Sequence, residues 1–329
     1  MNNHKVKALG LCSGGLDSIL SALVLKKQGI VVEWVAFETP FFSSDNARIA
    51  SKEADIPLTI KKVTNDYMKM LINPPAGYGK HMNPCMDCHA FMFKQAGEII
   101  KEKGFDFLFS GEVVGQRPMS QTKPSLRYVE KHSGFDGHIL RPLSAKILPE
   151  TLMEKKGLVN RELLLDLSGR GRKKQIKLAA ELKITNYPAP AGGCLLTDKK
   201  YSLKLKDLIE NQKTYSEKEL HLLKHGRHFR LENNAKVIVG RNQLDNENII
   251  KYHNPKTDTV LNTIGYNGPI TIITRNMKNE TIMLSASICA GYSKAPKNIP
   301  VDVSVKNKHG SRIIQVLGMP PSSFKSLLL

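Results

Sequence analysis

In the first half of the chain, segments whose apolar positions are typical of strands alternate with segments whose apolar positions have helical spacing. Short apolar, β-branched or aromatic runs, which are typical of buried strands, occupy residues 5–11, 30–39, 57–64 and 105–112. Apolar residues at helical spacing occupy residues 19–27, 45–54 and 89–104. Strands that alternate with helices favour parallel pairing, with the helices on both faces of the sheet. We therefore expect an α/β fold with a doubly wound parallel sheet for residues 1–200, and a loop over residues 77–88.

The pattern changes in the second half. A basic helix is predicted over residues 161–183, followed by a loop over 186–198. Beyond about residue 200, helices are predicted over 217–225 and 280–293, and strands over 236–242, 269–276 and 301–307. Strands and helices no longer alternate regularly there. Residues 201–329 are therefore expected to form a smaller α+β domain.

Composition adds a strong positive charge to this picture. The 329 residues are 41% hydrophobic and 24% charged, as in ordinary globular proteins. Lys and Arg number 49 against 30 Asp and Glu, which gives a net charge of +19 and favours a polyanionic partner. No apolar run reaches the roughly 18 residues of a membrane span, and the N-terminus lacks a signal-peptide pattern. We expect a cytoplasmic protein with no membrane partner.

One loop carries chemistry that the residue types explain. Ser13-Gly14-Gly15-Leu16-Asp17-Ser18 lies between the first predicted strand and the first predicted helix. Its glycines let the backbone approach phosphate oxygens, and a helix N-terminus offers free N–H groups and a positive dipole end. The two serine hydroxyls add donors, and Asp17 is a candidate Mg²⁺ ligand. The loop is not a Walker A motif, because no G-x-x-x-x-G-K-[ST] pattern occurs.

The SGGLDS sequence resembles the signature of the PP-loop (N-type) ATP pyrophosphatases. The resemblance implies cleavage of ATP to AMP and pyrophosphate while a substrate oxygen is activated. Ligands in open α/β sheets bind beyond the carboxyl ends of strands, which adds residues at the ends of three strands to the loop. The ATP-binding residues expected on these grounds are Leu11, Ser13, Gly14, Gly15, Asp17, Ser18, Phe37 and Gly111.

Three cysteines form a second candidate constellation. Cys85 and Cys88 have C-x-x-C spacing, and Cys194 follows two glycines far along the chain. A C-x-x-C alone is ambiguous among a redox pair, a zinc site and an iron–sulfur cluster. Together with the loop it resembles PP-loop tRNA-thiolating enzymes, some of which hold a [4Fe–4S] cluster on three cysteines. The other interpretations are a persulfide relay on cysteines alone, a zinc site with His89, and buried structural thiols.

The first 200 residues thus resemble PP-loop tRNA sulfurtransferases, the 2-thiouridylases and 4-thiouridine synthases. The resemblance implies ATP-dependent thiolation of a tRNA uridine, with Asp17, Cys85, Cys88 and Cys194 as catalytic residues. It also implies a sulfur donor, either sulfide or a persulfide-carrying protein. The alternatives are a PP-loop ligase or amidotransferase-type enzyme that acts on a small carbonyl substrate, and a non-catalytic RNA-binding protein.

The last 110 residues or so resemble the RNA-binding domain of NFACT proteins, in a stretch that includes residues 225–249, 280–296 and 301–305. This resemblance favours RNA as the polyanion. Basic residues beside predicted turns and in the basic helix are the candidate RNA contacts: Arg117, Arg170, Arg172, Lys173, Lys174, Arg227, Arg230 and Arg241.

Overall fold

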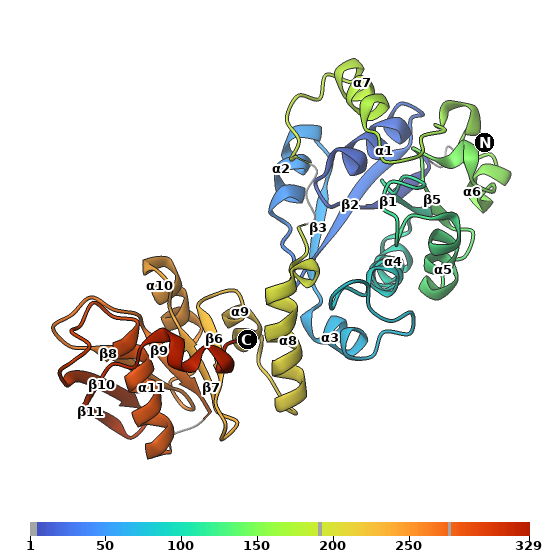
Figure 1. Cartoon of the computed structure of the whole chain (residues 1–329). Helices are drawn as coiled ribbons and strands as arrows, with labels where there is room; N and C mark the ends of the chain where they lie inside the picture. The colour runs from blue at the N-terminus through green and yellow to red at the C-terminus, as the bar shows by residue number, and fades with distance from the viewer. Residues whose placement is uncertain (1–4, 190–192, 276–277) are drawn as a thin grey trace. The chain divides into compact units, whose positions relative to one another are not determined.

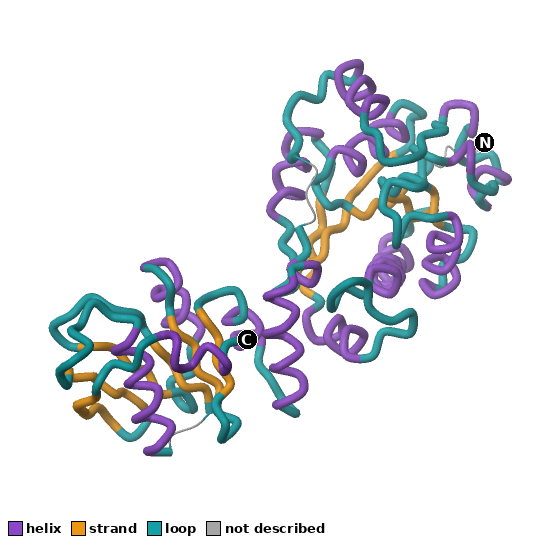
Figure 2. Tube along the Cα trace, in the orientation of Figure 1, coloured by secondary structure: helices purple, strands orange, loops and turns teal. Residues whose placement is uncertain are grey.

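The computed structural model describes residues 5–189, 193–275 and 278–329. The chain forms two compact units that divide between Thr197 and Asp198 (Figure 1). Figure 2 shows that strands lie at the centre of each unit and helices around them.

The N-terminal unit is built on a parallel sheet of five strands in the order β3-β2-β1-β4-β5. The strands are β1 (Lys7–Leu11), β2 (Val31–Glu38), β3 (Leu58–Lys62), β4 (Phe107–Ser110) and β5 (Ile139–Leu140). Because β1 pairs with β2 on one side and β4 on the other, the strand order reverses around β1. In such sheets the crevice beyond the carboxyl ends at the reversal is the usual ligand position.

Helices cover both faces of this sheet. They are α1 (Leu16–Lys26), α2 (Asp45–Ala54), α3 (Thr64–Ile72), α4 (Cys85–Lys103), α5 (Lys123–Ser133), α6 (Leu152–Lys155) and α7 (Lys173–Glu181). Figure 1 shows α1 and α7 on one side of the sheet and α4 and α5 on the other. Trp34, Phe107 and Phe109 are fully buried in the core between the layers. The predicted doubly wound α/β fold is confirmed.

Two predictions for this unit are wrong in detail. The loop predicted over 77–88 ends early, because α4 already begins at Cys85, behind Pro84 and with Asp87 in its first turn. The helix predicted over 161–183 is confined to α7, preceded by a short 3₁₀ turn at Arg161–Leu163. Between these two elements, Gly169 has a φ of +82° and Ser168 forms a bridge with Val114. A left-handed glycine and an extended pairing are incompatible with a continuous helix.

The C-terminal unit is an antiparallel sheet of six strands in the order β11-β10-β8-β9-β7-β6. The strands are β6 (Arg227–Arg230), β7 (Lys236–Val239), β8 (Thr259–Thr263), β9 (Thr271–Thr274), β10 (Val301–Asn307) and β11 (Gly310–Val316). The helices are α8 (Lys199–Asn211), α9 (Glu217–Leu222), α10 (Gln243–Tyr252) and α11 (Asn279–Gly291), with a 3₁₀ segment at Pro321–Leu327. The predicted α+β domain is confirmed.

Two apolar clusters hold the C-terminal unit together. Ala286 and Ile288 of α11 belong to the larger one, with Phe229 and Val303 of the sheet. Ile249 of α10 belongs to a smaller cluster with Leu222, Ile238 and Ile272. Alternate residues of β7 therefore serve different clusters, as the period of two in a strand requires. In the described parts of both units, no helix combines the length and hydropathy needed to cross a bilayer.

Candidate active site

The SGGLDS loop connects β1 to α1 at the carboxyl edge of the parallel sheet. Gly15 caps α1 in an extended conformation, and its N–H donates to Ser13 Oγ at 3.3 Å. Ser18 Oγ donates to the Gly15 carbonyl at 2.7 Å. The two serine side chains thus shape the turn that presents the N-terminus of α1. A helix N-terminus in this position is a ready site for phosphate oxygens.

Two glycines are required by close approaches of the backbone. Gly14 has a φ of +72°, and a Cβ there would lie 2.2 Å from the carbonyl carbon of Asn46. A Cβ on Gly111 would lie 2.4 Å from the carbonyl carbon of Asp17. The loop is therefore packed against the start of α2, and the turn after β4 is packed against the first turn of α1. Any side chain larger than hydrogen would force these segments apart.

Asp17 lies in a polar cluster at this contact. Its Oδ2 accepts a hydrogen bond of 2.8 Å from Gln116 Nε2, while its Oδ1 is buried without a protein partner. The Oε1 of Gln116 is also buried and without a partner. Burial raises the pKa of Asp17, against the Gln116 hydrogen bond and the charges of Arg172 and Arg117, which lower it. Two unpartnered oxygens on a bonded pair are suitable ligands for a hard cation such as Mg²⁺.

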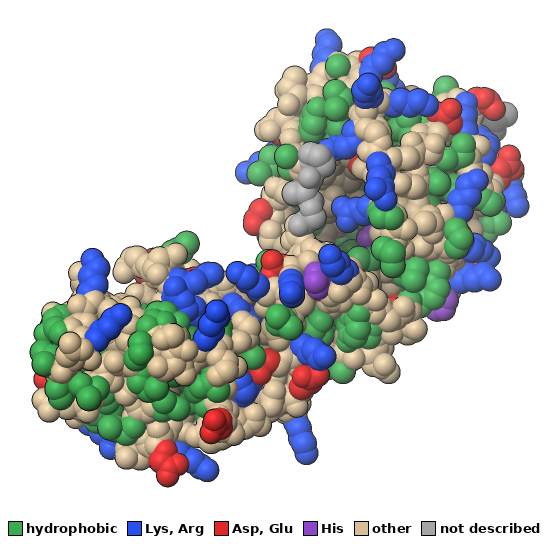
Figure 3. Space-filling model, in the orientation of Figure 1, with side chains coloured by type: hydrophobic (Ala, Val, Ile, Leu, Met, Phe, Trp, Pro, Cys, Tyr) green, Lys and Arg blue, Asp and Glu red, His purple; other side chains and the backbone are tan. Residues whose placement is uncertain are grey.

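The basic segment before α7 is brought to the same cluster. Gly169 N donates to the Val114 carbonyl at 2.8 Å, next to the Val114–Ser168 bridge. Arg172 then precedes α7, with its Nε buried and without a partner. The other candidates of this segment, Arg170, Lys173 and Lys174, are exposed. Figure 3 shows Lys and Arg side chains gathered around a hollow in the N-terminal unit.

The remaining candidate nucleotide contacts lie at the ends of neighbouring strands. Leu11 ends β1 and pairs with Val35 of β2 and Ser110 of β4. Phe37, near the end of β2, is buried, whereas Leu11 is half-buried. Both residues therefore lie at the carboxyl edge that also carries the loop.

The three cysteines come from two distant parts of the chain and influence one another electrostatically. Cys85 and Cys88 occupy the first turn of α4, and Asn83 Nδ2 donates to Cys85 Sγ at 3.2 Å. Cys194 precedes Leu195, whose N–H donates to the Phe41 carbonyl at 3.0 Å. This bond ties the segment after residue 193 to the loop that follows β2.

The environment of Cys88 and Cys194 keeps these two thiols protonated. Burial raises the pKa of Cys88 to about 12, against the hydrogen bond with the Tyr67 hydroxyl, and the electrostatic influence of Cys194 and Cys85 raises it further. Burial likewise raises the pKa of Cys194 to about 11, and the charge of Cys85 adds to the increase. In this structure Cys88 and Cys194 are therefore neutral thiols at pH 7. A thiolate at these positions needs a cation or a bound acceptor.

An iron–sulfur cluster would use Cys85, Cys88 and Cys194, and a zinc ion would add His89. Three thiols in one neighbourhood are the donor set that a cluster with one open iron would use. Over residues 5–189, 193–275 and 278–329, however, no group of three or more His, Cys, Asp or Glu side chains is arranged to hold a metal ion. Pro190, Ala191 and Gly192, which precede Cys194 in the motif, lie outside the described residues. His89 Nδ1 is engaged by Glu112 Oε1 at 2.6 Å.

A buried ionic network anchors the turn after β4. Glu112 accepts hydrogen bonds from Ser110 Oγ at 3.0 Å and Arg141 Nε at 2.9 Å, and also contacts His89. Although burial opposes it, the charges of Arg141 and His89 lower the pKa of Glu112 to about 2. Glu112 ends the strand predicted over residues 105–112, and the sequence pattern assigns it no other role. The partners of Glu112, and the position of Tyr67 beside Cys88, could not be found from local sequence patterns, because these contacts join distant segments.

The candidate RNA contacts of the C-terminal unit are engaged within the fold. Arg230 Nε and Nη2 donate to the two oxygens of Asp207 at 2.8 and 2.7 Å. Arg241 is bound in the same way by Asp245. The guanidinium of Arg227 lies over the Tyr292 ring, 4.6 Å from its centroid. All three remain candidates, but an RNA phosphate would have to share or displace these partners.

The two units match different families of known proteins. Residues 4–147 match the family model described as thiamine biosynthesis protein (ThiI), and residues 226–327 match that of the NFACT protein RNA binding domain. A tRNA-specific 2-thiouridylase of Thermoanaerobacter sp. is 29% identical over 242 residues, which cover 64% of this chain and 60% of that protein. A probable tRNA sulfurtransferase of Lachnospira eligens is 32% identical over 130 residues, which cover 36% of this chain and 31% of that protein.

Among solved structures, a 4-thiouridine synthetase–RNA complex with bound ATP aligns with a TM-score of 0.34 and 21% identity, over 54% of this chain and 52% of that one. The chain spans about 60% of the length of the first 2-thiouridylase that it matches. The two family matches agree with the two resemblances found in the motifs, and they fall in different units. The chain therefore joins one unit that matches the ThiI family model to another that matches the NFACT RNA-binding model.

Proposed function

We propose that this protein is an ATP-dependent tRNA sulfurtransferase that converts a tRNA uridine into a thiouridine. The proposal rests on the presence of two groups of residues in one domain, the SGGLDS loop and the three cysteines. The SGGLDS loop lies at the carboxyl edge of the sheet, and in the same unit Cys85 and Cys88 of α4 interact electrostatically with Cys194, whose segment is bonded to the loop after β2. A nucleotide loop alone would serve many ligases, but a thiol set beside it suits sulfur chemistry.

In the first step a carbonyl oxygen of the uracil ring attacks the α-phosphorus of ATP, and pyrophosphate leaves. The N–H groups at the start of α1 would receive the phosphate oxygens. Asp17 and Gln116 would hold Mg²⁺ through their unpartnered oxygens. Bound Mg²⁺ would neutralise phosphate charge. We also assign Arg172 to the phosphates, because its buried Nε and its influence on Asp17 direct it to the loop.

In the second step sulfur displaces AMP from the activated carbon. Cys85, Cys88 and Cys194 are the residues to which we assign the handling of sulfur. The [4Fe–4S] cluster stays part of the proposal on donor chemistry alone, since such a cluster would supply an iron site that binds sulfide. No step is assigned to it, because the described side chains do not form a closed ligand group. The sulfur donor would be sulfide or a persulfide-carrying protein.

The substrate assignment follows from the second domain and the charge. The net charge of +19 and the NFACT-type RNA-binding domain support an RNA partner. The names of the relatives specify tRNA, and we adopt that substrate here. The cytoplasm is the compartment that this substrate implies.

The proposal is tested by mass spectrometry of nucleosides from bulk tRNA of cells with and without the gene. Loss of one thionucleoside on deletion, restored by the wild-type gene but not by Asp17→Ala or Cys194→Ala, is the expected result. Rescue by Cys289→Ala, which changes a buried core thiol, is the matched control. An unchanged set of thionucleosides in a strain without a second thiolase would overturn the proposal.

The two variants also separate the two steps in vitro. Cys194→Ala should retain tRNA-dependent release of pyrophosphate but form no thiouridine, whereas Asp17→Ala should lose both. Iron and acid-labile sulfide, measured on protein purified without oxygen, then decide how the cysteines work. About four irons per chain, lost in Cys85→Ala, would support the cluster. Iron-free protein that still thiolates would support the cysteine-only relay.

A further inference from the structure

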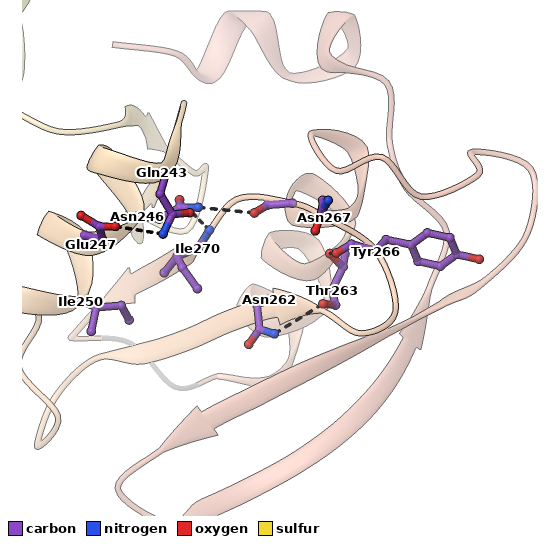
Figure 4. A pocket seen from close by; sticks show the side chains of 10 residues that line it. Gln243, Asn246, Glu247, Ile250, Asn262, Thr263, Tyr266, Asn267 and Ile270 are labelled. Atoms are coloured by element: carbon purple, nitrogen blue, oxygen red, sulfur yellow. Dashed lines mark hydrogen bonds between the residues drawn. The ribbon is translucent and has the colours of Figure 1, made fainter.

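The C-terminal unit has a pocket that none of the assignments above uses (Figure 4). Its volume is about 540 Å³, within the range of about 300–1,000 Å³ typical of small-ligand sites. One wall comes from α10, and the other from the end of β8 and the loop that leads to β9. The lining residues are Gln243, Asn246, Glu247, Ile250, Asn262, Thr263, Tyr266, Asn267, Gly268 and Ile270.

The chemistry of the lining is that of a site for a neutral, flat, hydrogen-bonding group. Four of its ten residues are amides, and no lysine or arginine is among them. Ile250 and Ile270 add apolar surface beside the amides. A free phosphate would find no cation there. The edge of a nucleobase, in contrast, offers paired donors and acceptors of the kind that Asn and Gln side chains recognise.

Part of this polar set is fixed by the fold and part is free to bind. Asn246 Oδ1 accepts from Ile270 N at 2.9 Å, and its Nδ2 donates to Gly268 O at 3.4 Å, which fixes the wall. Gln243 Nε2 donates to Glu247 Oε1 at 3.0 Å. This contact leaves the amide oxygen of Gln243 and the second carboxylate oxygen of Glu247 as acceptors, and the exposed amide of Asn267 offers donors as well as an acceptor.

We propose that this pocket binds an unpaired base of the RNA substrate, an inference that rests on the proposed function. The pocket lies inside the segment that matches the NFACT RNA-binding family. The C-terminal unit carries 21 Lys and Arg residues against 11 Asp and Glu residues, so it attracts a polyanion as a whole. Unpaired bases, unlike paired ones, present their hydrogen-bonding edges and both faces to a protein.

Two neighbouring side chains extend this site along a strand of RNA. The exposed ring of Tyr266 points away from α10 at the far side of the pocket, where it would stack on a flanking base (Figure 4). Lys294 N donates to the Asn267 carbonyl at 2.8 Å, and the Lys294 side chain is exposed. Its ammonium group is therefore a candidate phosphate contact just outside the pocket. Base recognition and backbone attraction would come from different residues.

The test measures binding of labelled RNA to the full-length chain by fluorescence anisotropy. The probes are 12-nucleotide single strands of each base type and a 12-base-pair duplex, at several salt concentrations. The wild-type chain should bind single strands more tightly than the duplex and prefer one base type. The double variant Gln243→Ala/Asn267→Ala should bind the preferred strand about 10-fold more weakly and lose the preference. Both residues are exposed, so the fold should tolerate these changes.

The salt dependence separates the two kinds of contact. The double variant should keep the wild-type slope of log affinity against log salt concentration, because it removes no phosphate contact. Lys294→Gln should reduce the slope by about one and keep the base preference. Gln315→Ala, an exposed amide of β11 outside the pocket, is the matched control and should change neither.

The results that would overturn the inference are equal wild-type affinity for single strands and duplex, or a base preference that survives in the double variant. If the variant still binds and thiolates tRNA like the wild type, the pocket inference fails while the proposed function stands. If the wild-type chain binds no RNA and deletion of the gene changes no thionucleoside, both fail.

Discussion

Gln116 Nε2 donates a hydrogen bond of 2.8 Å to Asp17 Oδ2, which joins two residues that lie 99 positions apart in the chain. The bond fixes the turn after β4 against the first turn of α1, where Gly111 already leaves no room for a side chain. Each partner keeps one buried oxygen without a protein partner. The hydrogen bond thus holds two residues together that each carry a buried oxygen free to accept a ligand.

Replacing Asp17 by Asn should lower pyrophosphate release from ATP by about 100-fold or more. The amide keeps the shape of the side chain but removes the charge that would hold Mg²⁺ beside the developing phosphate charge. The variant should also need more Mg²⁺ for half-maximal rate. Steady-state pyrophosphate assays over a Mg²⁺ titration test this. Asp66→Asn, an exposed carboxylate of α3, is the control that should leave both quantities unchanged.

Arg172 and Lys173 are adjacent in sequence but should affect different substrates. Arg172 has a buried Nε and influences Asp17, whereas Lys173 is exposed. Arg172→Ala should therefore raise the KM for ATP and lower kcat, together by about 10–100-fold, with tRNA affinity nearly unchanged. Lys173→Ala should leave ATP kinetics intact and reduce the salt slope of tRNA binding by about one. Equal effects of the two substitutions on tRNA binding would contradict the assignment of Arg172 to the nucleotide.

Gly14 and Gly29 provide a second matched pair. Both have a positive φ, of +72° and +77°, but only Gly14 approaches another backbone segment, whereas a Cβ on Gly29 would meet nothing within 4 Å. Gly29→Ala should cost about 1–2 kcal/mol of unfolding free energy, the strain of a left-handed alanine. Gly14→Ala should cost more, because the start of α2 must also move. Denaturant unfolding of both variants measures the difference, and comparable costs would show that the approach to Asn46 is easily relieved.

Features that depend on local interactions could be predicted from the sequence, whereas features that depend on long-range contacts could not. The parallel sheet and the SGGLDS loop were predictable, because strand periodicity and a glycine-rich turn are local properties. The predicted helix over 161–183 is interrupted at Gly169, which has a left-handed backbone and follows Ser168, the residue that pairs with a segment more than 50 residues away. The position of Arg172 followed from the same pairing. Local basic character makes Arg172 a candidate RNA contact, and the fold also places its charge close enough to Asp17 to lower the pKa of that carboxyl.

The ionic network around Glu112 could not be predicted from local sequence patterns either. Glu112, His89 and Arg141 lie on three segments, and only the folded sheet brings them together. Nothing in the spacing of these residues indicates that the carboxylate is buried and shared. The same holds for Tyr67 beside Cys88, since α3 itself was not predicted.

This network predicts a specific dependence of stability on pH. The folded-state pKa of Glu112 is about 2, below its ordinary value of 4.5, so the folded protein favours the carboxylate. The associated stability is fully present above about pH 4.5 and is lost as the pH falls through 2. Its size is about 3 kcal/mol, from 1.36 kcal/mol per pKa unit. Glu112→Gln should remove this dependence and lower stability at pH 7, because Arg141 stays buried with one carboxylate fewer.

Urea unfolding of the wild type and of Glu112→Gln at a series of pH values between 6 and 2.5 tests this prediction. The free energy of unfolding of the wild type should fall more steeply with acid than that of the variant, so the two curves converge at low pH. Glu162→Gln removes a carboxylate whose side chain is 84% exposed and should parallel the wild type throughout. Parallel curves for Glu112→Gln and the wild type would mean that Glu112 is not held as a carboxylate by Arg141 and His89. The turn that carries Gly111 and Gln116 would then need another anchor.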